Sequence, residues 1–87
     1  MKRFEELYHE LKTKLEADDQ SSQSVASIRK GCHFIGKKLV EEAAESWMAA
    51  EHEGKERTAE ELSQLLYHVQ LMMLASDITL EQIYEYL

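Results

Sequence analysis

Three observations on the sequence predict an all-α fold. The 87 residues contain no proline and only three glycines. Glu, Leu, Ala, Lys and Gln, all good helix formers, are abundant. Apolar residues recur at spacings of three and four, the period of a helix with one buried face. Because a chain of this size has a marginal core, we predict one domain, residues 1–87: a small antiparallel bundle of four to five helices completed by homodimerisation.

The first helix is predicted from Phe4 to about Leu15, because Phe4, Leu7, Leu11 and Leu15 form one apolar stripe. Residues 16–23 then become polar and predict a loop. A short helical turn is predicted next, with Ser24 as its N-terminal cap and Gly31 as its stop.

The second long helix is predicted from about Cys32 to Glu53. A continuous apolar pattern supports it, and Gly54 provides a C-terminal stop. The residues of this pattern are Ile35, Leu39, Ala43, Trp47 and Ala50. We expect Trp47, Met48, Met72 and Met73 to lie in the core or in a dimer seam.

The third long helix is predicted to begin at about Ala59, because Thr58 and Glu61 have the spacing of a capping box. Its centre is apolar on most sides, more than the helices of one chain can cover, and this favours a homodimer. The residues concerned are Leu62, Leu65, Leu66, Tyr67, Val69, Leu71, Met72, Met73 and Leu74.

A last short helix is predicted after Thr79, which forms a second capping box with Gln82. We expect its apolar residues to face inward. These are Leu80, Ile83, Tyr84 and Leu87.

Charge and composition exclude several classes of protein. The formal net charge is -7 and there is no basic tract, so no nucleic acid partner is expected. No segment approaches the roughly 18 apolar residues that span a bilayer, so no membrane association is expected. Cys32 is the only cysteine, which excludes an internal disulfide and fits the reducing cytoplasm, where we place the chain.

Carboxylates are grouped on two of the predicted helices. Glu42 and Glu45 share one face of the second long helix, and Glu61 lies near the start of the third. If these helices pack antiparallel, the three carboxylates can surround one point. Three oxygen donors with room for water suit a hard divalent cation such as Mg²⁺.

The two motifs resemble those of the all-α NTP pyrophosphohydrolase superfamily: Glu-Glu-x-x-Glu on one helix and Glu-x-x-(acid or amide) on the next. The segments Lys37–Glu45 and Glu61–His68, with Phe4–Tyr8 and Leu80–Tyr84 at the two ends, are similar to the phosphoribosyl-ATP pyrophosphohydrolase family in particular. The resemblance covers nearly the whole chain.

The resemblance implies Mg²⁺-dependent hydrolysis of phosphoribosyl-ATP to phosphoribosyl-AMP and pyrophosphate, the second step of histidine biosynthesis, by a homodimer. Glu42, Glu45 and Glu61 are the candidate metal ligands. Glu41, about 100° away from Glu42 on the helix, binds a second ion, holds a ligand in place or accepts a proton from the attacking water.

Basic residues near the carboxylates are candidates for phosphate binding. Lys37 and Lys38 lie one turn before the acidic pair, and Lys38 is the better placed. Arg29 and Lys30, beside the polar loop, are candidates for the phosphate groups of the substrate. Metal and a few basic groups together would let an acidic protein bind a polyanion.

The chain departs from the family pattern at two places. Gln64 stands where the superfamily usually has a fourth acid, and its amide can supply a neutral metal ligand or bind a metal-bound water. Val25 and Ala26 follow Ser24, where an aromatic and a hydroxyl residue are common.

Other interpretations remain open. A Glu-Glu-x-x-Glu motif alone is usually a solvated helix face, and Lys37 and Lys38 can simply pair with Glu41 and Glu42. Alternative functions are a house-cleaning nucleoside triphosphate pyrophosphohydrolase and a non-catalytic helical dimerisation module. The histidines His9, His33, His52 and His68 lack metal spacing and are left outside the site.

Overall fold

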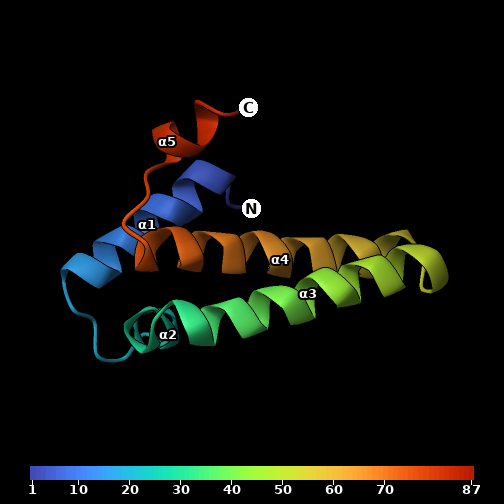
Figure 1. The fold of residues 1–87 in the computed structure, drawn as a ribbon, viewed down its shortest axis with the longest axis horizontal. Helices are drawn as coiled ribbons and strands as arrows, with labels where there is room; N and C mark the ends of the chain where they lie inside the picture. Colours follow the sequence, from blue (N-terminus) through green and yellow to red (C-terminus); the bar gives the residue numbers. More distant parts are fainter.

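The computed structural model describes residues 1–87 and consists of five α-helices without a strand, which confirms the predicted all-α class. The helices are α1 (Phe4–Glu16), α2 (Gln23–Lys30), α3 (Cys32–His52), α4 (Lys55–Ala75) and α5 (Leu80–Tyr84). The two 21-residue helices, α3 and α4, lie side by side and antiparallel, and they form the long axis of the molecule (Figure 1). None of the helices is sufficiently long and apolar to cross a membrane.

The shorter helices cover only one end of the α3–α4 hairpin (Figure 1). Helix α2 packs against α3 and α4 there, and α1 packs against α2 and α4. Leu11, Ile28, Ile35 and Leu71, one from each of these helices, form the larger buried cluster. The smaller cluster joins α1, α4 and α5. The core therefore lies beside the start of α3 and the end of α4.

The smaller cluster is supported by two polar contacts. Tyr8, Met73 and Leu80 are its buried members. The Tyr8 hydroxyl donates to the Ile78 carbonyl at 3.0 Å, and the fully buried amide of Gln70 donates to the Phe4 carbonyl at 2.7 Å. The first bond joins α1 to the segment before α5, and the second fixes the beginning of α1 against α4.

The other end of the hairpin has no covering helix in this chain. As a result, Trp47 and Met48 are 68% and 57% exposed, although the predicted stripe of α3 contains Trp47. Leu62 and Leu66 of α4 are exposed as well. Of the predicted stripe, only Ile35 is buried in the single chain.

Two of the predicted helix starts are wrong. Helix α4 begins at Lys55, since Gly54 adopts a φ of 89° and Glu53 and Gly54 alone connect α3 to α4. Thr58 is therefore inside the helix, where its hydroxyl donates to the Gly54 carbonyl at 2.7 Å and forms no capping box. The cap of α2 is Ser22, whose hydroxyl accepts from the Val25 amide.

Ser24 is instead inside α2, and its hydroxyl is hydrogen bonded to that of Tyr67 on α4. Val25, the first departure from the family pattern in this segment, is buried. Its role is therefore to anchor α2 on the core.

The stop at Gly31 and the capping box of α5 are confirmed. Gly31 has a φ of 95° and ends α2 immediately before α3 begins. The Thr79 hydroxyl accepts from the Gln82 amide, and the Gln82 side chain accepts from the Thr79 amide in return. The inward orientation predicted for α5 holds for Leu80, whereas Tyr84 and Leu87 are exposed.

Candidate active site

The structure brings together three carboxylates from the two long helices. Glu42 and Glu45 lie one turn apart on α3, and Glu61 lies on α4. One oxygen from each can be chosen so that all three are within 4.8 Å of one another. Ser46 and Ala49, which follow Glu45 by one and four residues on α3, are small and buried. They allow the two helices to approach closely, so that the carboxylates can meet.

Glu42 is a half-buried acid with one buried oxygen that has no donor. Its Oε2 atom is inaccessible to solvent and has no hydrogen-bond partner. Burial, followed by hydrogen bonding with Glu61 and the charge of Glu61, raises the pKa of the Glu42 carboxyl. Hydrogen bonding with Glu61 and the charge of Glu42 raise the pKa of Glu45 too. Two negative charges are thus unfavourable here without a cation.

Glu61 keeps its charge more readily than its two neighbours. Hydrogen bonds with Glu45 and Glu42, together with Arg57, lower the pKa of the Glu61 carboxyl. The Arg57 Nη2 atom lies 2.7 Å from Glu61 Oε1. Glu61 is only 9% exposed and is the one buried acid of the molecule.

Arg57 was missed as a site residue in the sequence analysis. The signal was present, because Arg57 precedes Glu61 by four residues on the same helix and follows Glu53 by four. The mistaken helix start at Ala59 concealed it, since that start placed Arg57 in a turn.

His68 was also left outside the site, although it lies next to it. Its charge, when present, lowers the pKa of Glu42 after the larger effects of burial and Glu61. The half-buried ring is held by the Gln64 carbonyl, 2.8 Å from Nδ1, and lies edge-on to Tyr67. Two turns from Glu61 on α4, His68 had the helical spacing that indicates this position.

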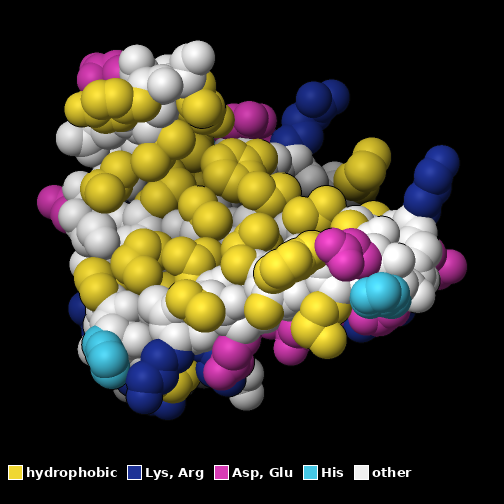
Figure 2. Space-filling view, turned by 45° about the vertical axis from the view of Figure 1, so that its right-hand side comes forward, with side chains coloured by type: hydrophobic (Ala, Val, Ile, Leu, Met, Phe, Trp, Pro, Cys, Tyr) yellow, Lys and Arg dark blue, Asp and Glu magenta, His cyan; other side chains and the backbone are white.

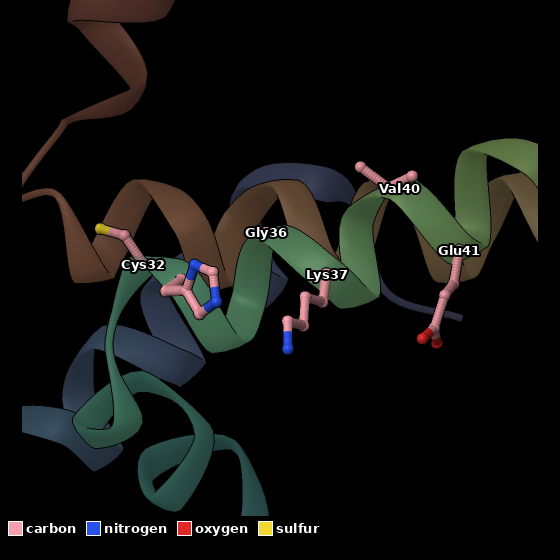
Figure 3. A pocket seen from close by; sticks show the side chains of 6 residues that line it. Cys32, Gly36, Lys37, Val40 and Glu41 are labelled. Atoms are coloured by element: carbon pink, nitrogen blue, oxygen red, sulfur yellow. The ribbon is translucent and has the colours of Figure 1, made fainter.

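Glu41, Lys37 and Lys38 are all exposed on α3. Glu41 is exposed, and its Oε2 atom is 3.8 Å from the Lys38 Nζ atom. Figure 3 shows Lys37 and Glu41 projecting from the same side of the helix, whereas Val40 projects from the other. Lys37 and Glu41 line a hollow together with Cys32 and Gly36. Glu41 is close enough to raise the pKa of Glu42 and Glu45 slightly.

The side chains of the remaining predicted residues form no hydrogen bond or ion pair with the three carboxylates. Arg29, at the end of α2, forms an ion pair of 3.0 Å with Asp18 of the preceding loop. The Lys30 Nζ atom lies 4.5 Å from the centre of the Phe34 ring. The Gln64 side chain is exposed on α4, one turn beyond Glu61.

The donor set fits a hard divalent cation. All three ligand groups are carboxylates, and the unpartnered Oε2 of Glu42 is an oxygen for which the protein itself provides no donor. Such oxygen ligands suit Mg²⁺, which also retains bound water. A cation would replace the repulsion between the carboxylates by attraction.

The fold and site together define an all-helical protein with a three-carboxylate centre between two antiparallel helices. The family model described as phosphoribosyl-ATP pyrophosphohydrolase matches residues 4–87. The chain therefore belongs to the phosphoribosyl-ATP pyrophosphohydrolase family and is an enzyme of the hydrolase class.

Several curated relatives are similar over essentially their whole length. A phosphoribosyl-ATP pyrophosphatase of Salinibacter ruber is 59% identical over 87 residues, which is 100% of both chains. One of Bifidobacterium adolescentis is 56% identical over 98% of both chains. One of Streptomyces avermitilis is 58% identical over 99% of this chain and 97% of the relative.

Proposed function

We propose that this chain hydrolyses phosphoribosyl-ATP to phosphoribosyl-AMP and pyrophosphate, with Mg²⁺ held by Glu42, Glu45 and Glu61, as the second step of histidine biosynthesis. The observation that carries the proposal is the convergence of these carboxylates, one of which has a buried oxygen without a donor. The names and full-length similarity of the relatives support the substrate.

In this reaction a water oxygen forms a bond to the α-phosphorus, and the bond from that phosphorus to the oxygen bridging to the β-phosphate breaks. Bound Mg²⁺ supplies positive charge for the phosphate oxygens and the leaving pyrophosphate. The carboxylates of Glu42, Glu45 and Glu61 position that charge. Glu41, exposed and outside the three-carboxylate group, is the residue we assign to accept the proton of the water.

Phosphate binding is assigned to the basic residues near the start of α3. Lys37 and Lys38 are exposed and lie on the same helix as Glu42, one turn before it. Arg29 and Lys30 end α2, which packs against α3 and α4. In this arrangement these four residues supply positive charge to the substrate phosphates, although the chain as a whole is acidic.

A homodimer completes the proposal. The α3–α4 hairpin exposes apolar side chains on both helices. On α3 these are Val40 and Trp47, two turns apart, and on α4 they are Leu62 and Leu66, one turn apart. Figure 2 shows hydrophobic side chains gathered over a broad face of the molecule. A second copy offers the same surface, which is self-complementary in a twofold dimer. Exposed apolar patches of this kind mark protein interfaces.

The test is pyrophosphate release from phosphoribosyl-ATP with and without Mg²⁺, with ATP and dUTP as competing substrates. We expect release from phosphoribosyl-ATP, dependent on Mg²⁺ and lost in Glu45→Gln. Release mainly from ATP or dUTP would assign the chain to house-cleaning of nucleotides. The absence of release from all three would refute the enzymatic proposal and favour a dimerisation module.

A further inference from the structure

Arg57 is bound by three acids, of which only Glu61 belongs to the three-carboxylate site. Its Nη2 atom lies 2.7 Å from Glu61 Oε1, its Nη1 atom 2.9 Å from Glu60 Oε2, and its Nε atom 3.5 Å from Glu53 Oε1. Glu53 follows the end of α3, whereas Glu60 and Glu61 are on α4. The guanidinium thus connects the end of α3 to α4 beside the turn at Gly54, the end of the hairpin that no other helix covers.

These contacts restrict the movement of the guanidinium. Its donors project in one plane and at fixed angles, so a bond at one nitrogen limits the positions of the others. Glu60 and Glu53 hold Nη1 and Nε, and this leaves Nη2 directed at Glu61. Arg57 cannot leave Glu61 without weakening its other two ion pairs.

The consequence for Glu61 is that Arg57 engages one of its two oxygens. Oε1 accepts from Arg57, and the positive guanidinium held beside this oxygen disfavours a cation there, so Oε2 is the oxygen that Arg57 leaves for a cation. The Glu61 side chain is 12% exposed, which leaves little room for another donor to replace Arg57. As long as the ion pair persists, Glu61 would hold a cation through one oxygen.

Monodentate and bidentate carboxylates suit different cations. Mg²⁺ requires nearly octahedral geometry at short distances, which single carboxylate oxygens and water provide. Ca²⁺ takes six to eight oxygens at longer distances and commonly binds both oxygens of one carboxylate. A site in which Glu61 cannot turn both oxygens to the ion disfavours Ca²⁺ more than Mg²⁺.

We infer that Arg57 is a positioning residue that restricts Glu61 to monodentate coordination and so makes the site select Mg²⁺ over Ca²⁺. This inference rests on the proposed metal site. It assigns a function to Arg57 that is distinct from charge compensation, because a nearby positive charge weakens the binding of both divalent cations alike.

The experiment is calorimetric titration of the full chain with Mg²⁺ and with Ca²⁺, without substrate, for the wild type and Arg57→Gln. The measured quantity is the ratio of the two dissociation constants, in which the effect of the lost charge cancels. We expect the preference for Mg²⁺ to fall about tenfold in Arg57→Gln, the lower end of the change in metal affinity that follows when outer-shell partners of metal ligands are altered. An unchanged ratio would overturn the inference, whatever happens to the individual affinities.

Two variants separate geometry from charge. Lys55→Gln removes a positive charge from the first turn of the same helix, where Lys55 forms no ion pair with the site, and should leave the ratio unchanged. Arg57→Lys keeps the charge but replaces the fixed fork by a single ammonium group, so the ratio should fall. A wild-type ratio in Arg57→Lys would show that charge suffices and would contradict the inference.

The failure of this inference is distinguishable from the failure of the metal site itself. If the wild type does not bind Mg²⁺, or if Glu45→Gln binds it equally well, the proposed site is refuted. If the wild type binds Mg²⁺ through these carboxylates but Arg57→Gln retains the ratio, only the role of Arg57 is refuted. Circular dichroism verifies that substitution of the half-exposed Arg57 leaves the helices intact.

Discussion

Glu42 and Glu61 meet between α3 and α4, and their carboxyl groups respond in opposite ways to the contact. The pKa of Glu42 is raised, chiefly by burial, whereas hydrogen bonds with Glu45 and Glu42 and the Arg57 guanidinium lower the pKa of Glu61. One acid is thereby favoured in its neutral form and the other in its charged form. Such a pair is expected at a site that binds cations or transfers protons.

The first prediction concerns the stability of the metal-free protein between pH 7 and about 5. Because their pKa is raised in the folded state, Glu42 and Glu45 take up protons at a higher pH than they do in the unfolded chain, where glutamate has the ordinary pKa of 4.5. Because the folded state binds more protons, the free energy of unfolding should rise as the pH falls from 7 towards 4.5. Urea unfolding at several pH values in the presence of EDTA measures this free energy.

The matched variant for this experiment is Glu42→Gln, which cannot titrate at position 42 and should flatten the rise. Glu61 affects the stability in the opposite direction. Because its pKa is lowered in the folded state, it stabilises the fold at pH values above 4.5, and this contribution is lost as the pH falls further. Equal pH dependence in wild type and Glu42→Gln would contradict the assignment.

The second prediction is that Mg²⁺ raises the melting temperature. Binding to the folded state alone stabilises it by about 1.4 kcal/mol at a concentration ten times Kd, which corresponds to about 5–10 °C for a domain of this size. Glu45→Gln removes one of three ligands and should reduce the shift to less than half. Differential scanning fluorimetry at fixed ionic strength measures it, with Na⁺ as the control salt.

The third prediction concerns the exposed apolar face of the hairpin. Trp47→Lys should weaken the dimer by at least about 2 kcal/mol, or about thirtyfold in Kd, because it introduces a charge into the proposed interface. The helical content should not change, since Trp47 is 68% exposed in the single chain. Sedimentation equilibrium measures Kd.

The control for the dimer is Tyr86→Lys, at a residue that is 91% exposed near the C-terminus and outside the hairpin. It should dimerise like the wild type. A monomeric wild type at micromolar concentration would disprove the proposed dimer.

The fourth prediction tests Gln64. If its side chain faces the cation, Gln64→Asp adds a charged ligand and should tighten Mg²⁺ binding about threefold to tenfold, as charge count does in other carboxylate sites. Gln64→Asn shortens the side chain in the same way without adding charge, and it serves as the matched control. Equal affinity of the two variants would place residue 64 outside the coordination sphere.

The fifth prediction concerns the core. Leu71 is 2% exposed and contacts the cluster shared by α1, α2, α3 and α4, so Leu71→Ala should lower the free energy of unfolding by about 2–5 kcal/mol. Leu87→Ala, at a residue that is 95% exposed, should change it by less than about 0.5 kcal/mol. Denaturant unfolding of both variants at one protein concentration provides the comparison.

Much of the fold is determined by local signals in the sequence. Helical periodicity identified the helices, and the positive φ angles at Gly31 and Gly54 agree with the stops predicted there. The capping box of Thr79 and Gln82 was predicted from spacing alone, since both bonds form within one turn. The grouping of Glu42 with Glu45 has the same origin, because i, i+3 residues share a helix face.

Only the tertiary structure decided what each helix face contacts. Periodicity marks Trp47 and Ile35 as members of one apolar stripe, but α1 and α2 cover only the end of the hairpin where Ile35 lies, and Trp47 remains exposed. The Thr58 signature failed because Gly54 starts α4 earlier than a capping pattern predicts. The bond between Arg57 and Glu61, the approach of Glu61 to Glu42 and the buried oxygen without a donor depend on how two helices pack. The spacing of residues along one helix does not determine how far they lie from the residues of another helix.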